Sequence, residues 1–402
     1  MTIAYILGQF PSHTEHFIHN EIVELGSRGI NIRILALQRG PAGALPAAAG
    51  SGARYRGAFF SFATLAAHAF LASRSGARYF RVLGNALSSG AFRPAPLLKR
   101  IRDFSTAVCF LHALRDGPVT HLHAHFASLP TRIAGIMSAL SGIPFSCSAH
   151  ANDIYTTPPA ELVKNLAGAR FIVTCTAYNK VYLDGVLAAG APKRVMHVYH
   201  GIDLSGWAWQ DRPFAFTAGH VLHILTVGRL VEKKGIMYLL EAVRQLRETG
   251  RPVRLSVVGE GPCRPRLAAY IAQHGLGPVV QLHGALTQPE VKALYQVADV
   301  FVLPCTVTGN GDRDGLPNVL MEALAVGLPV ISTAVSAIPE LIRDGETGLL
   351  IPEKSAAGIL DALERLGKDP RLCRELARNG REKLEQAFSI EVSTNQLVGL
   401  FR

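Results

Sequence analysis

The chain of 402 residues is 49% hydrophobic and only 18% charged, a composition that supports well-filled cores and excludes a disordered polypeptide. Its length exceeds what one ordinary core holds and suits two domains of roughly 150 to 200 residues each. The net charge of +11 is concentrated in residues 1–205, where 19 Lys and Arg side chains outnumber 9 Asp and Glu side chains.

The N-terminal segment Met1–Gly8 lacks the basic start and the cleavage site of a signal peptide, and its apolar pattern predicts a first strand. The longest mostly apolar stretch, Gly57–Ala72, has about 16 residues, whereas a membrane-spanning helix needs roughly 20. The six cysteines are scattered without a C-x-x-C pair, which is typical of reduced thiols. We therefore expect a cytoplasmic protein without a transmembrane segment.

Short apolar runs alternate with helical patterns along the whole chain, which predicts an α/β fold of parallel sheets covered by helices. The runs are continuously apolar, as expected for strands buried on both faces. The predicted strands are Ile3–Leu7, Ile32–Ala36, His121–His125, Phe145–Ala149, Phe171–Cys175 and Val195–Tyr199, then Leu222–Val227, Arg254–Val258, Val279–His283, Val300–Leu303 and Pro329–Ser332.

The two sets of strands predict two Rossmann-like domains that face each other across a cleft. We expect an N-terminal domain over residues 1–205, a linker over 206–219 and a C-terminal domain over 220–384. The final helix, about 385–402, is expected to pack back on the first domain. Loops at the carboxyl ends of parallel strands bind ligands in such sheets, so the sites are expected there.

Residues 51–115 carry ten basic side chains and one acidic side chain. A basic surface rich in aromatic residues binds nucleic acid or an anionic membrane, and a solvated basic face is the alternative. The absence of an RNA- or DNA-binding motif argues against nucleic acid. The candidates for membrane contact are Arg78, Arg81, Lys99, Arg100, Arg102, Phe59, Phe60 and Phe62.

Three histidines, His121, His123 and His125, alternate along one predicted strand. Such a set can bind a metal, but no fourth ligand of matching type is evident in the sequence. A strand that runs into the cleft is the favoured interpretation.

The segment His223–Gly235 is the first of two clusters with evident chemistry. Its buried strand ends at Gly228, and Arg229, Lys233 and Lys234 follow at once. Cations at the carboxyl end of a central strand can hold a diphosphate and offset the charge that it gains on leaving. Solvated loop charges are the alternative interpretation.

The second cluster, Asp312–Glu322, follows a buried strand and opens a helix, with Pro317 in the first turn. The helix is apolar around most of its circumference, and Asn318 and Glu322 share one face at i, i+4 spacing. An unpaired buried carboxylate is costly, so we expect Glu322 to meet a polar ligand, such as ribose hydroxyls, or a partner. The helix start would suit a phosphate. A structural Glu paired to a buried Arg is the alternative.

The pair Asp312-x-Asp314 also has the form of a metal-binding motif. Because it overlaps the cluster that ends at Glu322, we expect no metal there. The chain has no phosphate loop of the G-x-x-x-x-G-K-[ST] type and no G-x-G-x-x-G after a strand, which argues against an NTPase or a dehydrogenase.

These motifs resemble those of the retaining family-4 glycosyltransferases of the GT-B fold. The resemblance rests on Gly-Arg-x4-Lys-Gly at residues 228–235 and on Asp-Gly-x-Pro-x4-Glu-Ala at residues 314–323. Further similar segments are Val257–Pro262, Asp344–Leu350 and Tyr199–Asp203. Two more, Phe10–Ile18 and Ser148–Asp153, resemble the exopolysaccharide and colanic-acid branch. The resemblance covers nearly the whole chain.

The resemblance implies roles for individual residues. Glu322 would hold the donor ribose, Asp314 would touch the donor sugar in place of the family's usual Glu, and His150 would lie near that sugar. Gly8 stands where the family has two glycines, and His200 where it often has Asn. The implied donor-binding set is Gly8, Arg229, Lys234, Gly259, Glu260, His283, Gly284, Asp314, Gly315, Leu316, Asn318, Val319 and Glu322. The implied catalytic set is His150, Arg229, Lys234 and Asp314, and the acceptor-side set is Ser12, Thr14 and His125.

The expected activity is transfer of a sugar, with retention, from a UDP- or GDP-linked donor to a saccharide acceptor. We expect a lipid-linked acceptor in surface polysaccharide biosynthesis, contact with an anionic membrane at the inner face of the plasma membrane, no cofactor, no metal and no nucleic-acid partner. A nucleotide-sugar epimerase of the same fold and a non-catalytic basic binding protein are the alternatives.

Overall fold

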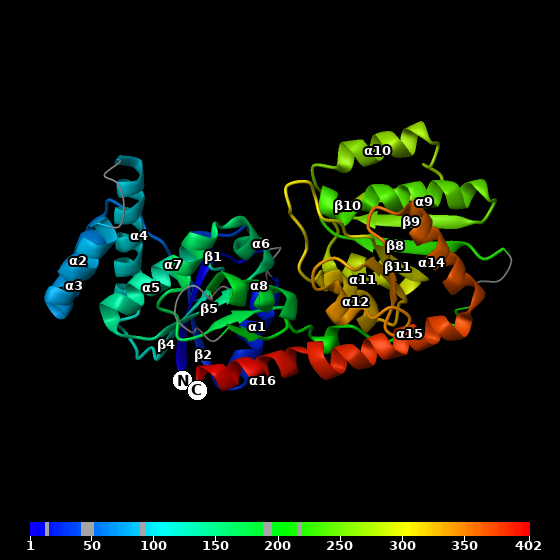
Figure 1. The fold of residues 1–402 in the computed structure, drawn as a ribbon. Helices are drawn as coiled ribbons and strands as arrows, with labels where there is room; N and C mark the ends of the chain where they lie inside the picture. Colours follow the sequence, from blue (N-terminus) through cyan, green and yellow to red (C-terminus); the bar gives the residue numbers. More distant parts are fainter. Residues whose placement is uncertain (13–15, 42–51, 89–93, 188–194, 215–218) are drawn as a thin grey trace. The chain divides into compact units, whose positions relative to one another are not determined.

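The computed structural model describes residues 1–12, 16–41, 52–88, 94–187, 195–214 and 219–402, and the chain divides into two compact units (Figure 1). Unit 1 comprises Met1–Cys175, Asn179–Val198 and Thr394–Arg402. Unit 2 comprises Thr176–Tyr178 and Tyr199–Ser393. Among the described residues, no helix is both long enough and apolar enough to cross a membrane.

Unit 1 contains, in its described residues, a seven-stranded parallel sheet of order β3-β2-β1-β4-β5-β6-β7. Its strands are β1 (Thr2–Phe10), β2 (Asn31–Arg39), β3 (Arg54–Tyr55), β4 (His121–His125), β5 (Phe145–Ala149), β6 (Ile172–Thr174) and β7 (Val195–His197). Its helices are α1 (His16–Ser27), α2 (Phe62–Ser75), α3 (Ala77–Ser88), α4 (Pro94–Ala113), α5 (Leu129–Ser141), α6 (Ala151–Thr156), α7 (Pro159–Leu166) and most of α8 (Ala177–Leu187).

Unit 2 has a six-stranded parallel sheet in the described part of the chain, with the order β10-β9-β8-β11-β12-β13. Its strands are β8 (Leu222–Val227), β9 (Val253–Val258), β10 (Val280–Gly284), β11 (Val300–Leu303), β12 (Val330–Thr333) and β13 (Leu349–Ile351). Its helices are α9 (Ile236–Glu248), α10 (Arg264–Gln273), α11 (Gln288–Val297), α12 (Asn318–Ala325), α13 (Ile338–Leu341), α14 (Ala356–Lys368), α15 (Pro370–Lys383) and the start of α16 (Ile390–Phe401).

Alternate residues of a strand supply different cores, as expected of sheets buried on both faces. On β11, Val300 and Val302 pack in one apolar cluster with α9 and α14, whereas Phe301 and Leu303 pack in another with α11 and α12. On β1, Ala4 and Ile6 pack away from Ile3, Tyr5 and Leu7 in the same way. The prediction of two Rossmann-like parallel sheets is therefore confirmed.

The strand order reverses at β1 and β4 in unit 1 and at β8 and β11 in unit 2. At such a reversal the neighbouring loops diverge to opposite faces and leave a crevice at the carboxyl edge of the sheet, where ligands bind. Each unit therefore has one preferred binding edge.

Several boundaries differ from the predicted ones. β1 continues to Phe10, so Gly8 lies within the strand rather than in the loop after it. The short strands β3 and β13 were not predicted. Residues 206–214, predicted as linker, lie in unit 2, where Trp207 packs edge-on against Tyr295, and Arg212 donates hydrogen bonds to the carbonyls of Tyr295 and Ala298.

The end of the C-terminal helix α16, from Thr394, lies in unit 1. Phe401 packs edge-on against the rings of His121 and His123 on β4 and contacts Phe171. The last residues of the chain therefore complete the core of the N-terminal sheet.

Candidate functional site

The loops that follow β8 and β11 are packed backbone against backbone at the reversal point of unit 2. Gly235 has a φ of 65°, and a Cβ placed there would lie 1.9 Å from the carbonyl oxygen of Pro304. The amide of Thr306 donates to the carbonyl of Lys233 at 2.8 Å. Only glycine fits this approach, and it brings Lys233 and Lys234 next to the loop that leads to α12.

The two lysines form ion pairs with the two aspartates of that loop. Lys234 Nζ lies 2.7 Å from Asp314 Oδ2, and both side chains are largely buried. Lys233 Nζ lies 2.9 Å from Asp312 Oδ1 and 3.6 Å from Asp314 Oδ1. Burial acts to lower the pKa of Lys234, but the Asp314 carboxylate outweighs it, so the pKa stays above the ordinary value. Lys234 is therefore a fixed positive charge at neutral pH.

This pairing bears on the metal alternative for Asp312 and Asp314. Each carboxylate already has an ammonium group within 3 Å. A divalent cation at these carboxylates would be repelled by both ammonium charges. The geometry therefore argues against a metal site at this motif.

Glycines after β9 and at the end of β10 let the loops that follow β8, β9 and β10 approach one another closely. Gly259 has a φ of 131°, and a Cβ on it would lie 2.0 Å from the carbonyl oxygen of Gly228. Its amide donates to the carbonyl of Gly284 at 2.8 Å, and a Cβ on Gly284 would meet Glu260 Oε1 at 2.9 Å. The exposed side chain of Arg229 starts directly beside this junction. The structure thus brings Arg229, Gly259, Glu260 and Gly284 together.

His283 and Glu260, two other predicted donor residues, have partners within unit 2. His283 Nε2 lies 3.1 Å from Ser256 Oγ on the neighbouring strand, and burial lowers its pKa, which favours the neutral ring. Glu260 forms an ion pair with Arg264 at 3.0 Å. Both residues remain partly or largely exposed, so a ligand can still reach them.

Glu322 lies on α12, whose other side chains are mostly buried. Its Oε2 accepts a hydrogen bond from the hydroxyl of Tyr295 at 3.0 Å, and that hydroxyl also lies 3.2 Å from the carbonyl of Val319. The predicted polar partner is thus a tyrosine on α11 rather than an arginine. Burial raises the pKa of Glu322 to about 7, although Tyr295 and Lys292 act to lower it. Glu322 as a whole residue is half-buried, unlike most of its apolar neighbours on the helix.

The remaining predicted residues of this loop and helix surround Glu322 and Asp314. Asn318, the first residue of α12, is exposed, and Val319 is half-buried. Gly315 accepts a hydrogen bond from the amide of Ala337 at 3.3 Å, and Leu316 packs against the core beneath the helix. Pro317 precedes the helix as its cap instead of lying in its first turn.

In unit 1, His125 and His150 are stacked at the carboxyl edge of the sheet. Their ring centroids are 5.5 Å apart with an interplanar angle of 12°, and His125 Nδ1 lies 3.4 Å from His150 Nε2. His125 Nε2 is 3.2 Å from Glu21 Oε1 on α1. These contacts join two of the predicted residues. Gly8 and Ser12 are partly buried on the same unit, and Thr14 lies outside the described residues.

Asp153 was not predicted as a site residue, yet it fixes the loops on which His150 lies. Its carboxylate accepts the amide of His150 at 2.8 Å and also the amide of Ala127, which follows β4. Burial raises the pKa of Asp153 to about 7, and these hydrogen bonds oppose that shift. The His-x-x-Asp spacing of a helix cap was the available sequence signal.

His121 and His123 are buried and structural in character. His123 lies 2.7 Å from Ser146 Oγ through Nδ1 and 2.9 Å from Ser148 Oγ through Nε2, so both ring nitrogens have hydroxyl partners. Burial lowers the pKa of His123 and brings that of His121 to about 4. The ligand atoms of Glu21, His123 and His125 do cluster within 4.8 Å, but the serine contacts already use both nitrogens of His123.

Comparison with known proteins places this geometry in a family. The family model described as glycosyl transferases group 1 matches residues 211–383, which include the unit 2 site residues described above. The chain is also 30% identical over 313 residues to alpha-D-kanosaminyltransferase of Streptomyces kanamyceticus, covering 71% of this chain and 77% of that protein. The chain belongs to this family.

Other similarities are consistent with the assignment. The chain is 38% identical over 215 residues to the putative colanic acid biosynthesis glycosyltransferase WcaL of Escherichia coli strain K12. That alignment covers 53% of this chain, and the chain spans about half the length of that relative, 52%. The crystal structure of Anabaena Alr3699/HepE in complex with UDP superposes with a TM-score of 0.73 at 14% identity, over 99% of both chains. The fold is of the GT-B type, as the resemblance predicted.

The pKa of Glu322 generates the first prediction. An ionised carboxylate accepts hydrogen bonds from two vicinal hydroxyls, whereas a protonated one does so less well. Affinity for a nucleotide-sugar donor should therefore rise as pH increases through about 7, by at most about tenfold per pH unit below that value. Titration calorimetry from pH 6 to 9 measures it for the wild type, Glu322→Gln and Tyr295→Phe.

Glu322→Gln should bind weakly, without the pH-dependent component of the wild type, because its side chain does not titrate in this range. Tyr295→Phe should move the midpoint upward, because the hydroxyl no longer stabilises the carboxylate. Wild-type affinity and pH dependence in Glu322→Gln would contradict the assignment of this carboxyl to the donor.

Proposed function

We propose that the protein is a glycosyltransferase that moves a sugar from a nucleotide-diphosphate donor to a saccharide acceptor with retention of configuration. The observation that carries the proposal is the arrangement at the reversal point of unit 2. There, Lys234 is paired with Asp314, and Glu322 is held by Tyr295. A positive charge of fixed position and an oriented carboxyl are what a diphosphate and a ribose require.

In the proposed complex the donor diphosphate lies against Arg229 and Lys234. The bond between the anomeric carbon and the phosphate oxygen breaks, and negative charge accumulates on the leaving diphosphate. Both cations stabilise that charge, and their help grows along the reaction, so they lower the barrier rather than only the donor Kd. Lys234 needs no proton transfer for this role, because its pKa is held above the ordinary value.

The proposed reaction retains the configuration of the sugar, and no side chain is assigned as a nucleophile. We therefore infer a same-face displacement. The acceptor hydroxyl attacks from the side on which the diphosphate leaves, and a phosphate oxygen takes its proton. Asp314 and the amides of Gly315 and Leu316 are assigned to the donor sugar, and His150 of unit 1 to stabilising the positive character that this sugar gains. These roles follow the family resemblance residue by residue.

We further propose a lipid-linked acceptor at an anionic membrane surface. Similarity to the E. coli relative, a putative colanic acid biosynthesis glycosyltransferase, supports an acceptor in surface polysaccharide assembly. Unit 1 supplies the second support. The exposed fractions are 90% for Phe60, which precedes α2, 92% for Phe62, the first residue of α2, and 63% for Phe80 on α3. Arg78 and Arg81, also on α3, are exposed as well. Exposed aromatic and basic side chains on the same pair of helices match an interface of apolar chains and anionic headgroups.

The leaving-group assignment is tested with Arg229→Ala. Because Arg229 is exposed, its removal should leave the melting temperature unchanged and lower kcat about a hundredfold, as loss of one charge-stabilising group does. Lys234→Ala is a less clean variant, since it removes the nearer of the two ammonium partners of the largely buried Asp314 and should also lower stability. Turnover is followed by product analysis with a panel of UDP- and GDP-sugars in the presence of EDTA.

The matched control is Arg254→Ala, which removes an exposed arginine from β9 of the same unit. Unchanged kcat in Arg229→Ala would remove the assignment, and strict dependence on a divalent metal would revive the metal interpretation of Asp312 and Asp314. Conversion of the donor in the absence of acceptor would favour the epimerase alternative.

Membrane contact is tested by co-sedimentation with vesicles of neutral and anionic lipid. Each basic residue near an anionic surface contributes about 1 kcal/mol, so the double variant Arg78→Glu/Arg81→Glu should lose most of the binding. Binding should require anionic lipid and weaken with added salt. Arg374→Glu, an exposed charge reversal on α15, is the control and should bind as the wild type does. Equal partitioning onto both vesicle types would favour a soluble acceptor.

A further inference from the structure

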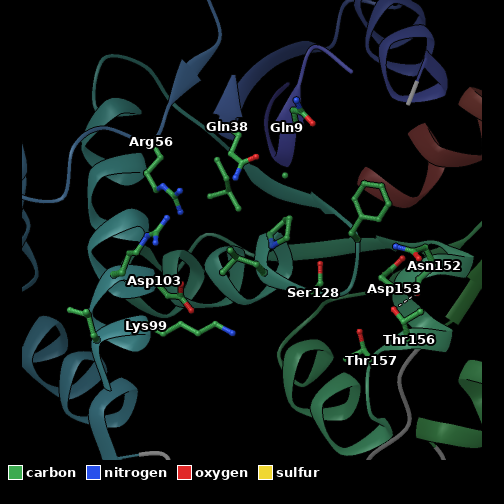
Figure 2. Close-up of a pocket in the computed structure, with 17 residues that line it drawn as sticks. Gln9, Gln38, Arg56, Lys99, Asp103, Ser128, Asn152, Asp153, Thr156 and Thr157 are labelled. Atoms are coloured by element: carbon green, nitrogen blue, oxygen red, sulfur yellow. Dashed lines mark hydrogen bonds between the residues drawn. The ribbon is translucent and has the colours of Figure 1, made fainter. Parts of the chain in front are cut away.

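A cavity of about 830 Å³ opens at the carboxyl edge of the unit 1 sheet (Figure 2). Its walls come from the ends of β1 and β2, from the loops after β4 and β5, and from α4. It therefore occupies the reversal point of the sheet order, where β1 and β4 are neighbours. The sequence indicated the basic character of residues 51–115 but not the cavity, and Lys99 and Arg102, which were candidates for membrane contact, line it.

Three cations line the cavity: Arg56 after β3, and Lys99 and Arg102 on α4. Among the described residues, none of these three side chains takes part in a hydrogen bond or an ion pair. In Figure 2, the side chains of Arg56 and Lys99 extend toward the cavity from opposite sides of its cationic end. Burial and the proximity of Arg102 lower the pKa of Arg56 from its ordinary value, although the Asp103 carboxylate acts in the opposite direction.

The two carboxylates of the cavity are already engaged. Asp103 lies 2.9 Å from the guanidinium of Arg132, which neutralises it. Asp153 accepts the amides of Ala127 and His150. The cationic end of the cavity therefore keeps an excess of positive charge.

The N-terminus of helix α5 adds to this charge. Ser128, Leu129 and Pro130 line the cavity, and α5 is 13 residues long. The hydroxyl of Ser128 does not cap the helix, so it is available to a ligand. The positive end of a helix dipole attracts anions, phosphates in particular. Phe126, with a φ of 75°, makes the sharp bend that turns the chain from β4 toward this helix.

Hydroxyl and amide groups line the rest of the cavity. Ser128, Asn152, Thr156 and Thr157 lie toward one end, and Gln9 and Gln38 lie toward the strands (Figure 2). A mixture of hydroxyls and amides suits the hydroxyl groups of a sugar. The cavity therefore combines a site for an oxyanion with room for a neighbouring saccharide.

We propose that this cavity binds a diphosphate group of the acceptor, with Arg56, Lys99 and Arg102 as its cationic ligands and the start of α5 as an additional anion-binding group. The inference rests on the proposed glycosyl transfer and names the acceptor class, a saccharide carried on a diphosphate. Three cations together match a diphosphate better than a single carboxylate, which one arginine satisfies in a bidentate pair.

A second cavity of unit 1, about 740 Å³ in volume, provides a matched comparison. It is lined by Arg74, Arg78 and Arg115, so its basic content is similar. It lies instead beside Gly117–Val119, before the start of β4, and beside the C-terminal end of α5 at Leu140 and Ser141. The negative end of the helix dipole disfavours an anion there. Position relative to α5 thus distinguishes two cavities of similar size and charge.

The test is titration calorimetry with pyrophosphate on the wild type, Arg56→Gln, Arg102→Gln, Arg74→Gln and Arg229→Ala. Arg56→Gln and Arg102→Gln should each weaken pyrophosphate binding about tenfold at one class of site, the unit 1 cavity. Arg74→Gln should leave that class unchanged, and so should Arg229→Ala, which reports on pyrophosphate bound in unit 2. Equal melting temperatures show that the variants fold. Unchanged affinity in Arg56→Gln and Arg102→Gln, or a loss confined to Arg74→Gln, would overturn the proposal.

Kinetics with three acceptors then identifies the source of the oxyanion: a diphosphate-linked saccharide, the same saccharide without the diphosphate, and one that carries a uronate. Arg56→Gln should raise KM about tenfold for the first acceptor and leave that for the second unchanged. A tenfold rise in KM for the uronate acceptor, with no rise for the diphosphate-linked acceptor, would contradict the diphosphate assignment. Pyrophosphate binding that depends on Arg56, combined with no transfer from any donor, would refute the proposed function and leave the cavity assignment standing.

Discussion

The ion pair between Lys234 and Asp314 joins the two loops that form the binding edge of unit 2. It depends on a backbone contact, because Gly235 approaches the carbonyl of Pro304 too closely for any side chain. With that contact in place, the lysine from the β8 loop reaches the aspartate of the β11 loop. The pair then fixes the position of a positive charge where a diphosphate would lie, and it orients Asp314 at the start of the segment that leads to α12. Replacing Asp314 would leave the largely buried charge of Lys234 without its partner, and replacing Lys234 would leave Asp314 with only the longer contact to Lys233.

Both units have a parallel sheet whose strand order reverses, but the charged side chains at the two binding edges are arranged differently. At the carboxyl edge of unit 2, lysines and aspartates pair with each other, so each charge is positioned by another. At the corresponding edge of unit 1, the side chains of Arg56, Lys99 and Arg102 form no ion pair within the described part of the chain, while Asp103 is paired with Arg132 and Asp153 accepts backbone amides. A paired site is preorganised for catalysis. An unpaired cationic cavity is suited to binding an anion, and this difference supports the division into a donor unit and an acceptor unit.

Sequence patterns predicted the long buried strands and the two clusters of unit 2 because these features are local. Continuous apolar runs mark strands covered on both faces, and the i, i+4 spacing of Asn318 and Glu322 follows from helix geometry. The short strands β3 and β13, of two and three residues, were not predicted because they have too few residues to show a hydrophobic pattern. The end of β1 was misplaced because Gly8 resembles a strand terminator. In the structure the pairing of β1 with β2 continues past it to Phe10.

The partners of the site residues could not be predicted, since they come from distant parts of the chain. Tyr295 reaches Glu322 from the preceding helix, and Asp153 joins loops that follow two different strands. The cavity of unit 1 combines Arg56 with residues of α4 more than 40 positions later. Such contacts are set by the order of strands in the sheet, which apolar periodicity does not encode.

The central claim, that the edge formed by the β8 and β11 loops holds the donor nucleotide, is tested most directly by hydrogen–deuterium exchange with UDP and with GDP. The account predicts slower exchange at residues 228–236 and 304–322 when the preferred nucleotide is added, and loss of that protection in Glu322→Gln. Saturating nucleotide that leaves exchange in both segments of unit 2 unchanged would contradict it.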